Sequence, residues 1–382
     1  MKFIPYGRQD ITEEDINVVI KTLRSDFITQ GPKVEEFESG LRGLTNAKYS
    51  FAVNSATSGL HIACLALGLE KNDIVWTSPI TFVASSNCAL YEGALVDFVD
   101  IDIDTLNISV CALENKLIEA KRDNILPKIL IPVHMCGQSC DMERIYELSR
   151  VYGFSIIEDA SHAIGGKYLN SSVGSCQYSD ITVFSFHPVK IITTAEGGAC
   201  LTNDSSIAQK LELLRSHGVT RSSELLENKN EGPWYYEQHS LGFNYRMTDI
   251  QAALGSSQLE RIENIILKRN EIAKIYTEKL SSFVECPQIN DKIISSFHLF
   301  VIQVPSEIRK EVFIKLRSKG IGVNVHYYPV YLQPYYKKLG FSEGYCPLAE
   351  KYYSKAISIP MHPTLTTDEI SYVCDTIIEA VS

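Results

Sequence analysis

Short apolar segments alternate with helical patterns between residues 50 and 205, and this alternation constrains the fold more than any other feature of the sequence. Strands that alternate with helices form a mostly parallel sheet with helices on both faces, because two parallel neighbours need a long crossover between them. We therefore predict an α/β fold built on a large, mostly parallel mixed sheet. The predicted strands span residues 50–53, 74–76, 95–99, 129–133, 154–157, 181–186 and 198–201.

The N-terminal segment predicts a helix that begins near Thr12. Thr12 is a candidate N-cap, and Asp15 follows it at the spacing of a capping box. An apolar stripe along this segment is typical of an amphipathic helix. The residues of the stripe are Ile16, Val19, Ile20 and Leu23.

The remainder of the chain predicts a long loop and a second domain. Residues 219–240 are polar and irregular, which is typical of a surface loop, and loops of that length are often functional. We divide the chain into a large α/β domain over residues 1–250 and a small C-terminal α+β domain over residues 251–382. The expected elements after the loop are a long helix over 249–280, a strand near 297–304, a helix near 307–319, a strand near 322–327 and a C-terminal helix capped by Thr366 with Glu369.

The composition excludes several classes of function. The 382-residue chain has a formal net charge of −10 and no run of like charges, whereas a nucleic-acid binder is expected to carry a basic face. The N-terminus lacks the apolar stretch of a signal peptide, and no apolar run approaches the ~20 residues of a membrane-spanning helix. We therefore expect a cytoplasmic protein that binds neither nucleic acid nor a membrane.

Ten cysteines are scattered along the chain, several of them inside apolar segments, which is typical of free, buried thiols in the cytosol. His134, Cys136 and Cys140 stand close enough in sequence to raise a metal site as an alternative. Their spacing matches no closed zinc set and a fourth ligand is not evident, so we predict no metal.

Lys190 and Asp159 are the strongest candidates for chemistry. Lys190 follows the predicted strand over 181–186, and Asp159 ends the strand pattern that begins at residue 154. An acid and a lysine at the rims of neighbouring strands are what pyridoxal phosphate (PLP) requires. The lysine amine forms an imine with the cofactor aldehyde, and the carboxylate keeps the pyridine nitrogen protonated. Alone, each residue has an ordinary explanation, as a solvated cation or a helix-capping acid.

The segment 54–59 joins the first predicted strand of the sheet to a helix over about 58–67. Its small and hydroxyl residues, Thr57 and Ser58 among them, leave backbone N–H groups free to meet a phosphate at a helix N-terminus. An ordinary N-cap is the alternative explanation. The chain contains neither a G-x-G-x-x-G motif nor a Walker motif, which argues against a dinucleotide enzyme and a P-loop ATPase.

Thr57, Phe82, Asp159, Ser185 and Lys190 share one property, because each lies at or just after the end of a predicted strand. Alone, Phe82 would be a core aromatic and Ser185 an ordinary strand serine. Ligands of open α/β sheets bind outside the carboxyl ends of the strands. This joint placement therefore predicts one binding site.

With these residues in view, the chain resembles the DegT/DnrJ/EryC1/StrS group of sugar aminotransferases, which are fold-type I PLP enzymes, over nearly its whole length. The motifs that carry the resemblance are residues 27–32, 158–162, the Lys190 loop, 241–249 and 326–329. Within the group the chain is most similar to the enzymes that aminate C4 of a UDP-linked 4-keto-6-deoxy sugar on the route to pseudaminic acid. This narrower resemblance lies in residues 4–8, 54–58, 137–141, 185–196 and 214–218.

The resemblance implies a role for each matching residue. Lys190 would bind the cofactor and shuttle a proton, and Asp159 would pair with the pyridinium nitrogen. His162 would lie beside the oxygen on the cofactor ring, and Phe82 would stack on that ring. A phosphate site shared between two subunits implies a homodimer with shared active sites. The phosphate ligands would be Thr57, Ser58 and Ser185, joined by Asn244 from the partner subunit.

The resemblance also implies that glutamate gives the amino group and that a UDP-linked keto sugar receives it across the dimer cleft. Arg8 is expected to meet the pyrophosphate, and aromatic side chains are expected to stack on the sugar or the uracil. Ordinary loop packing is the alternative for each contact. The candidate contacts are Tyr6, Arg8, Phe27, Trp234, His326 and Tyr327.

Other functions stay open at this point. Another nucleotide keto sugar, such as the D-xylo epimer, a dTDP-linked sugar or a C3 ketone, would suit the same residues. A PLP-binding protein without catalysis and a binding module without PLP are further alternatives. Lys190, where some relatives carry His, favours amino transfer over dehydration.

Overall fold

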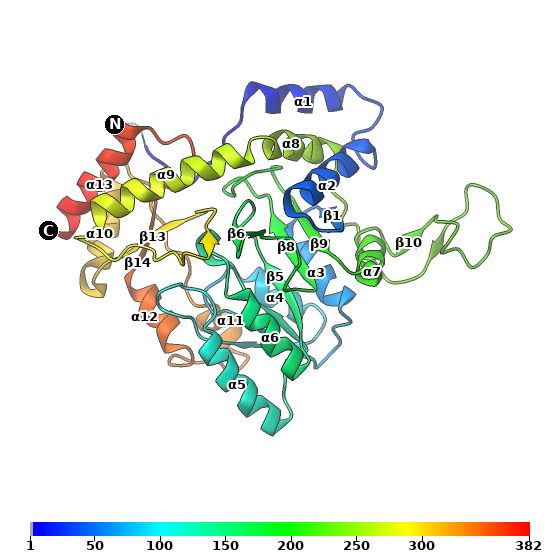
Figure 1. Cartoon of the computed structure of the whole chain (residues 1–382), viewed down its shortest axis with the longest axis horizontal. Helices are drawn as coiled ribbons and strands as arrows, with labels where there is room; N and C mark the ends of the chain where they lie inside the picture. The colour runs from blue at the N-terminus through cyan, green and yellow to red at the C-terminus, as the bar shows by residue number, and fades with distance from the viewer. Residues whose placement is uncertain (1–2) are drawn as a thin grey trace.

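A seven-stranded sheet lies at the centre of the protein in the computed structural model, which describes residues 3–382 (Figure 1). β9 runs antiparallel to both of its neighbours, and the other pairs are parallel. Each predicted segment overlaps one of the strands, and the predicted α/β fold with a mostly parallel mixed sheet is confirmed. The strands are β1 (Tyr49–Val53), β2 (Ile74–Thr77), β3 (Leu95–Phe98), β4 (Ile129–Ile131), β5 (Ser155–Asp159), β8 (Ile181–Ser185) and β9 (Gly198–Thr202), in the order β1-β9-β8-β5-β4-β2-β3.

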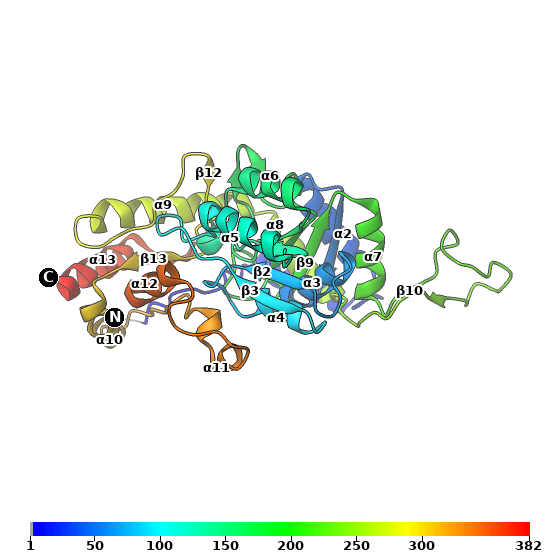
Figure 2. The ribbon, with the colours of Figure 1, turned by 90° about the horizontal axis from the view of Figure 1, so that it is seen from below.

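Helices cover both faces of this sheet. One face packs against α3 (Ala56–Ala66), α4 (Ala84–Leu90) and α7 (Ser205–Arg215). The other face packs against α2 (Pro32–Thr45), α5 (Val110–Asp123) and α6 (Met142–Tyr152). Figure 2 shows α5 and α6 on one side of the sheet and α4 on the other. Because both faces are covered, the central strands are buried throughout, which explains their continuous apolar runs in the sequence.

The C-terminal part of the chain packs around a second group of buried apolar side chains. The strand expected near 297–304, the helix expected near 307–319 and the C-terminal helix are confirmed, the last with a complete capping box. The domain boundary at residue 250 stays a prediction. The main elements of this part are α9 (Ile262–Leu280), β13 (Phe300–Gln303), α10 (Ser306–Ser318), β14 (Ala356–Ile359) and α13 (Thr367–Val381), with β13 antiparallel to β14.

None of the helices within residues 3–382 is both long enough and apolar enough to cross a membrane.

Short elements complete the fold. The short elements are β6 (Lys167–Tyr168), β7 (Ser171–Ser172), β12 (Ile293–Ile294), α11 (Pro334–Lys337), α12 (Pro347–Lys355) and two 3₁₀ turns at Met135–Gly137 and Val330–Leu332.

The single helix expected over 249–280 is wrong. The structure has two helices there, α8 (Asp249–Leu259) and α9. Arg261, between them, leaves helical geometry with φ −101° and ψ 2°. Its guanidinium pairs with Asp10 at 3.0 Å and Asp15 at 2.7 Å, so the break ties the helices to the N-terminal segment.

The strand expected near 322–327 is also wrong. Only one isolated bridge, between Asn324 and Ser358, joins this segment to β14. The segment from Asn324 onward lines a cavity instead of continuing along the sheet. Its side chains are therefore placed by that cavity, as described below.

α1 (Glu13–Leu23) lies beside α8 (Figure 1), and its polar side contacts the body of the protein. The predicted capping box of Thr12 and Asp15 is present, and Asp15 is fully buried. The apolar stripe faces outward in the single chain, where Ile16 is 42% and Leu23 is 55% exposed. A carboxylate, rather than the apolar stripe, therefore docks α1 at the end of α8. The donors to Asp15 are Ser257 Oγ (2.6 Å), Gln258 Nε2 (2.7 Å) and Arg261 Nη2 (2.7 Å).

Residues 219–240 form the surface loop that the sequence predicts. A hairpin of β10 (Val219–Thr220) and β11 (Glu237–Gln238) closes its base, and the loop projects from the body of the protein (Figure 1). The carboxylate of Glu237 accepts hydrogen bonds from the amides of Glu227 and Asn228, each at 2.8 Å. These bonds hold part of the loop in one shape.

We predict that Asp15→Ala lowers the free energy of unfolding by about 3 kcal/mol, because it removes a buried acceptor from the guanidinium of Arg261 and from two buried polar side chains. Urea unfolding followed by circular dichroism measures this change. Glu13→Ala, an exposed change in the same turn, is the matched control and is expected to shift stability by less than ~0.5 kcal/mol. Equal stability of the two variants would contradict the docking role of Asp15.

Candidate active site

A cavity of about 690 Å³ opens at the carboxyl ends of β5 and β8. Its wall includes the N-terminus of α3 and the segment 324–328 from the C-terminal part of the chain. The structure brings nine of the residues singled out in the sequence to this one cavity. They are Tyr6, Thr57, Phe82, Asp159, His162, Ser185, Lys190, His326 and Tyr327.

Asp159 ends β5 and is buried, with a donor on each carboxylate oxygen. Ser85 Oγ donates to Oδ2 at 2.6 Å, and the amide of Ser161 donates to Oδ1 at 3.1 Å. The hydroxyl of Thr81 lies 2.7 Å from Ser85 Oγ and extends this network. Because both oxygens are engaged, the carboxylate has one fixed orientation beside the cavity.

Lys190 lies in the loop that follows β8, where its amide donates to the carbonyl of His187 at 2.9 Å. Its side chain is partly open to the cavity but surrounded by protein atoms. This burial disfavours the ammonium and lowers the pKa of Lys190 to about 8, although the carboxylate of Asp159 opposes the change. Near neutral pH the site therefore releases a proton from Lys190 more easily than an exposed lysine would.

His162 is held by two rings from the C-terminal part of the chain. Tyr327 Oη lies 3.2 Å from His162 Nε2, and the two rings are nearly parallel, with 23° between their planes. The ring of His298 contacts His162 with 4.3 Å between centroids. Burial, and then the charges of Lys190 and His326, hold the pKa of His162 well below its ordinary value, so the ring is neutral.

The N-terminus of α3 forms a polar part of the cavity wall. Ser55 is the N-cap of α3 and its hydroxyl accepts the amide of Ser58 at 3.1 Å, whereas the amides of Ala56 and Thr57 have no acceptor within the helix. Thr57 and Ser185 line the cavity. β9 approaches this turn so closely that a Cβ on Gly198 would lie 2.6 Å from the amide nitrogen of Ala56. Free amides, hydroxyls and the positive end of a helix suit a phosphate group.

Ser58 has a different place from the one expected. Its Oγ donates to Asn54 Oδ1 at 2.6 Å and lies 2.9 Å from Ser55 Oγ, and Ser58 does not line the cavity. The hydroxyl is used within the turn itself. Ser58 therefore orders the turn that presents Thr57. This geometry does not favour a direct contact between the hydroxyl of Ser58 and a phosphate.

Four further residues singled out in the sequence lie outside this cavity in the single chain. Trp234 is in the projecting loop and is 73% exposed, and Phe27 is 53% exposed. Arg8 and Asn244 are exposed as well. Their expected contacts involve a dimer cleft or a partner subunit, so these contacts stay predictions.

The sequence analysis missed Ser85, which orients Asp159, and His298, which lines the cavity. Ser85 stands three residues after Phe82, which is one helical turn, and this spacing could have placed it on the same side. His298 stands in a segment that reads as a strand, and nothing in its sequence neighbourhood marks it. Its place in the cavity depends on how the C-terminal part of the chain packs.

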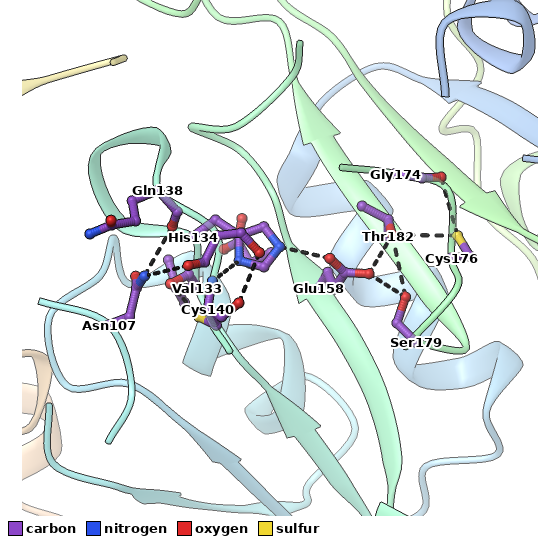
Figure 3. Close-up of polar contacts among 12 residues, drawn as sticks. Asn107, Val133, His134, Gln138, Cys140, Glu158, Gly174, Cys176, Ser179 and Thr182 are labelled. Carbon is purple, nitrogen blue, oxygen red and sulfur yellow. Dashed lines mark hydrogen bonds and ion pairs between the residues drawn. The ribbon is translucent and has the colours of Figure 1, made fainter. Parts of the chain in front are cut away.

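Glu158 precedes Asp159 on β5, so its side chain points to the other side of the strand and away from the cavity lining. Figure 3 shows Glu158 among His134, Ser179 and Thr182. Burial opposes a charge on Glu158, but its hydrogen bonds outweigh burial and hold the pKa of Glu158 below its ordinary value. His134 Nδ1 accepts the amide of Cys140 at 3.1 Å, so both ring nitrogens of His134 are engaged in hydrogen bonds. The donors to Glu158 are His134 Nε2 (2.7 Å), Thr182 Oγ1 (3.1 Å) and Ser179 Oγ.

The residues of this cavity fit PLP. Lys190 supplies an amine for the aldehyde, and Asp159 supplies an oriented carboxylate for the ring nitrogen. The first amides of α3, which β9 approaches closely at Gly198, supply donors for the phosphate. His162 Nδ1 is buried without a partner among the described residues, which is typical of a site completed by a ligand.

Comparisons with known proteins assign the family. The model of the DegT/DnrJ/EryC1/StrS aminotransferase family matches residues 9–378. The UDP-4-amino-4,6-dideoxy-N-acetyl-beta-L-altrosamine transaminase of Campylobacter jejuni is 38% identical over 379 residues, which cover 98% of this chain and 96% of that relative.

Solved structures agree with this assignment. Helicobacter pylori PseC, an aminotransferase involved in the biosynthesis of pseudoaminic acid, superimposes with a TM-score of 0.90 and 32% identity, covering 100% of this chain and 99% of that one. The sugar aminotransferase Spr1654 of Streptococcus pneumoniae in its PLP form gives a TM-score of 0.89 and 30% identity, covering 99% and 98%. The family depends on PLP. The chain belongs to the DegT/DnrJ/EryC1/StrS aminotransferase family and is a PLP-dependent sugar aminotransferase.

Proposed function

We propose that this enzyme moves an amino group from glutamate to C4 of a UDP-linked 4-keto-6-deoxy-N-acetylhexosamine, in pseudaminic acid biosynthesis. The observation that carries the proposal is the meeting of Lys190 and Asp159 in one cavity. The choice of sugar is supported by the similarity to the Campylobacter transaminase and to Helicobacter PseC along nearly the whole chain.

Bound PLP supplies an electron sink, which lets an amino compound lose the proton from its α-carbon. Lys190 is the proposed catalytic base, because its lowered pKa leaves Nζ able to hold and release a proton near neutral pH. The carboxylate of Asp159, whose two oxygens accept hydrogen bonds from Ser85 and Ser161, would keep a proton on the ring nitrogen. Lys190 would thus act at the α-carbon that loses its proton, and Asp159 would act at the ring nitrogen.

The remaining residues bind and orient. We assign the phosphate to Thr57, Ser185 and the first amides of α3, and the ring face to Phe82. His162 would lie beside the ring oxygen. The amide of Asn244 from a second chain, the homodimer and the cytoplasmic location belong to the proposal and stay predictions. The proposed contacts to the nucleotide sugar are Tyr6, His326 and Tyr327 within the cavity, with Arg8, Phe27 and Trp234 near it in the dimer.

The first test of this function uses the visible spectrum of the bound cofactor. Glutamate is expected to convert the purified protein to its pyridoxamine form, and the L-arabino UDP-linked 4-keto sugar is expected to restore the PLP absorbance. The D-xylo epimer, a dTDP-linked 4-keto sugar and a C3 ketone serve as comparison substrates. A response to one of these alone would keep the family and reject the proposed substrate.

Lys190→Ala is expected to lower amino transfer by about 10²–10⁴-fold, because it removes the base that moves the proton. It is also expected to abolish covalent attachment of PLP, which borohydride reduction and mass spectrometry detect. Lys48→Ala, at an exposed lysine, is the matched control and leaves both properties unchanged. Undiminished amino transfer in Lys190→Ala would refute the role of Lys190.

The pKa of Lys190 predicts a pH dependence for PLP attachment to the cofactor-free protein. The neutral amine is the nucleophile, so the rate is expected to rise with pH and to be half-maximal near pH 8, the value to which burial lowers the pKa. Asp159→Asn removes the charge that favours the ammonium, so the midpoint is expected to move further down. Stopped-flow absorbance measures both rates. A midpoint near 10.5, the ordinary value, would contradict the burial of Lys190.

A further inference from the structure

His298 lines the cavity but has no part in the function proposed above. It is 4% exposed, and within residues 3–382 its Nδ1 has no hydrogen-bond partner. Because Nδ1 makes no hydrogen bond there, the place of the ring is defined by its packing against neighbouring side chains.

The contacts of His298 point to His162. The two rings lie with 4.3 Å between centroids and 46° between planes. Ser296, two residues before His298, donates from Oγ to the carbonyl of His162 at 2.8 Å. The short segment from Ser296 to His298 therefore holds both the backbone and the ring of His162.

Tyr327 completes the contacts of the His162 ring. Its hydroxyl lies 3.2 Å from His162 Nε2, on a segment separate from that of His298. Burial, and then the charges of His162 and Lys190, hold the pKa of His298 well below its ordinary value, as burial does for His162. Two neutral rings pack without repelling each other, whereas two imidazolium rings would not.

Arg269 fixes the backbone that carries His298. Arg269 is 1% exposed, and its Nη1 donates to three carbonyl oxygens instead of to a carboxylate. A backbone held at these points gives the ring of His298 a fixed place in the cavity wall. The acceptors are the carbonyls of Phe297 (2.9 Å), His298 (3.4 Å) and Met361 (3.1 Å).

We propose that His298 is a positioning residue, whose ring holds the ring of His162 against Tyr327 so that His162 meets PLP in one orientation. The inference rests on the proposed place of His162 beside the cofactor ring. It assigns no proton transfer to His298. The flat ring is the required feature, so a phenyl ring at this position does the same work.

The test is a double-mutant cycle on the affinity for PLP, measured by titrating cofactor-free protein with PLP and following the absorbance of the bound form. His298→Leu keeps much of the volume without the flat ring and is expected to weaken PLP binding roughly tenfold, which corresponds to ~1.4 kcal/mol. His298→Phe is expected to stay within about twofold of the original protein. In a His162→Ala background, His298→Leu has no further effect, because both changes act through one ring.

His362→Leu is the matched control. His362 is a 3% exposed histidine of the same C-terminal part, its Nε2 also lacks a partner among the described residues, and it lies outside the cavity lining. Its replacement leaves the affinity for PLP unchanged. If His298→Leu does not fold, as judged by its melting temperature, His298→Gln takes its place in the cycle with the same expectation.

Two results would overturn the inference: additive effects of the His162 and His298 changes, or a His298→Phe variant that binds PLP as weakly as His298→Leu. Unchanged affinity in both His298 variants would do so too. Failure of the proposed function has a different signature, because it shows as a lack of response to UDP-linked keto sugars while PLP still binds.

Discussion

The pairing of β5 with β8 is the constraint on which the whole site depends. Asp159 stands opposite Val183 in this parallel pair, so the carboxylate of Asp159 and the loop that follows Ser185 reach the same edge of the sheet. β9 then runs antiparallel to β8, with Gly198 opposite Ser185. Because Gly198 has no side chain, the start of α3 can approach β9 closely. A slip of one residue in this register would turn Asp159 toward the buried side of β5 and bring Glu158 to the cavity.

The groups around Lys190 share one electrostatic requirement. Lys190 works as a neutral amine in a buried cavity. A protonated histidine beside it would add a positive charge to that cavity, and burial disfavours such a charge. Burial, followed by the charge of Lys190, lowers the pKa of His326 to about 4, and its ring lies 2.7 Å from Ser358 Oγ. His162 and His298 are neutral for the same reason. Asp159 is the anion that balances a proton on Lys190, so one carboxylate serves both the lysine and the cofactor ring.

The sequence allows the rim of the sheet to be predicted because its signals are local. Asp159 and Lys190 follow apolar runs, and the end of a run marks the end of a strand. The wall made by His298 has no such signal, since it depends on packing between distant segments. Arg261 interrupts a continuous helical pattern because it pairs with carboxylates far away in the sequence. Periodicity likewise finds an apolar stripe on α1 but does not show that buried Asp15, on another side, meets the protein.

The two walls of the cavity are made at different times during synthesis. A growing chain leaves the ribosome with its N-terminus first, and its N-terminal parts fold first. A chain that has emerged only as far as β9 carries Asp159 and Lys190 at an open edge of the sheet, because His298 and Tyr327 have still to be added. Fewer protein atoms then surround the amine of Lys190, so less burial opposes its ammonium form. The C-terminal part completes the wall around this lysine, so the full burial that lowers its pKa requires the whole chain.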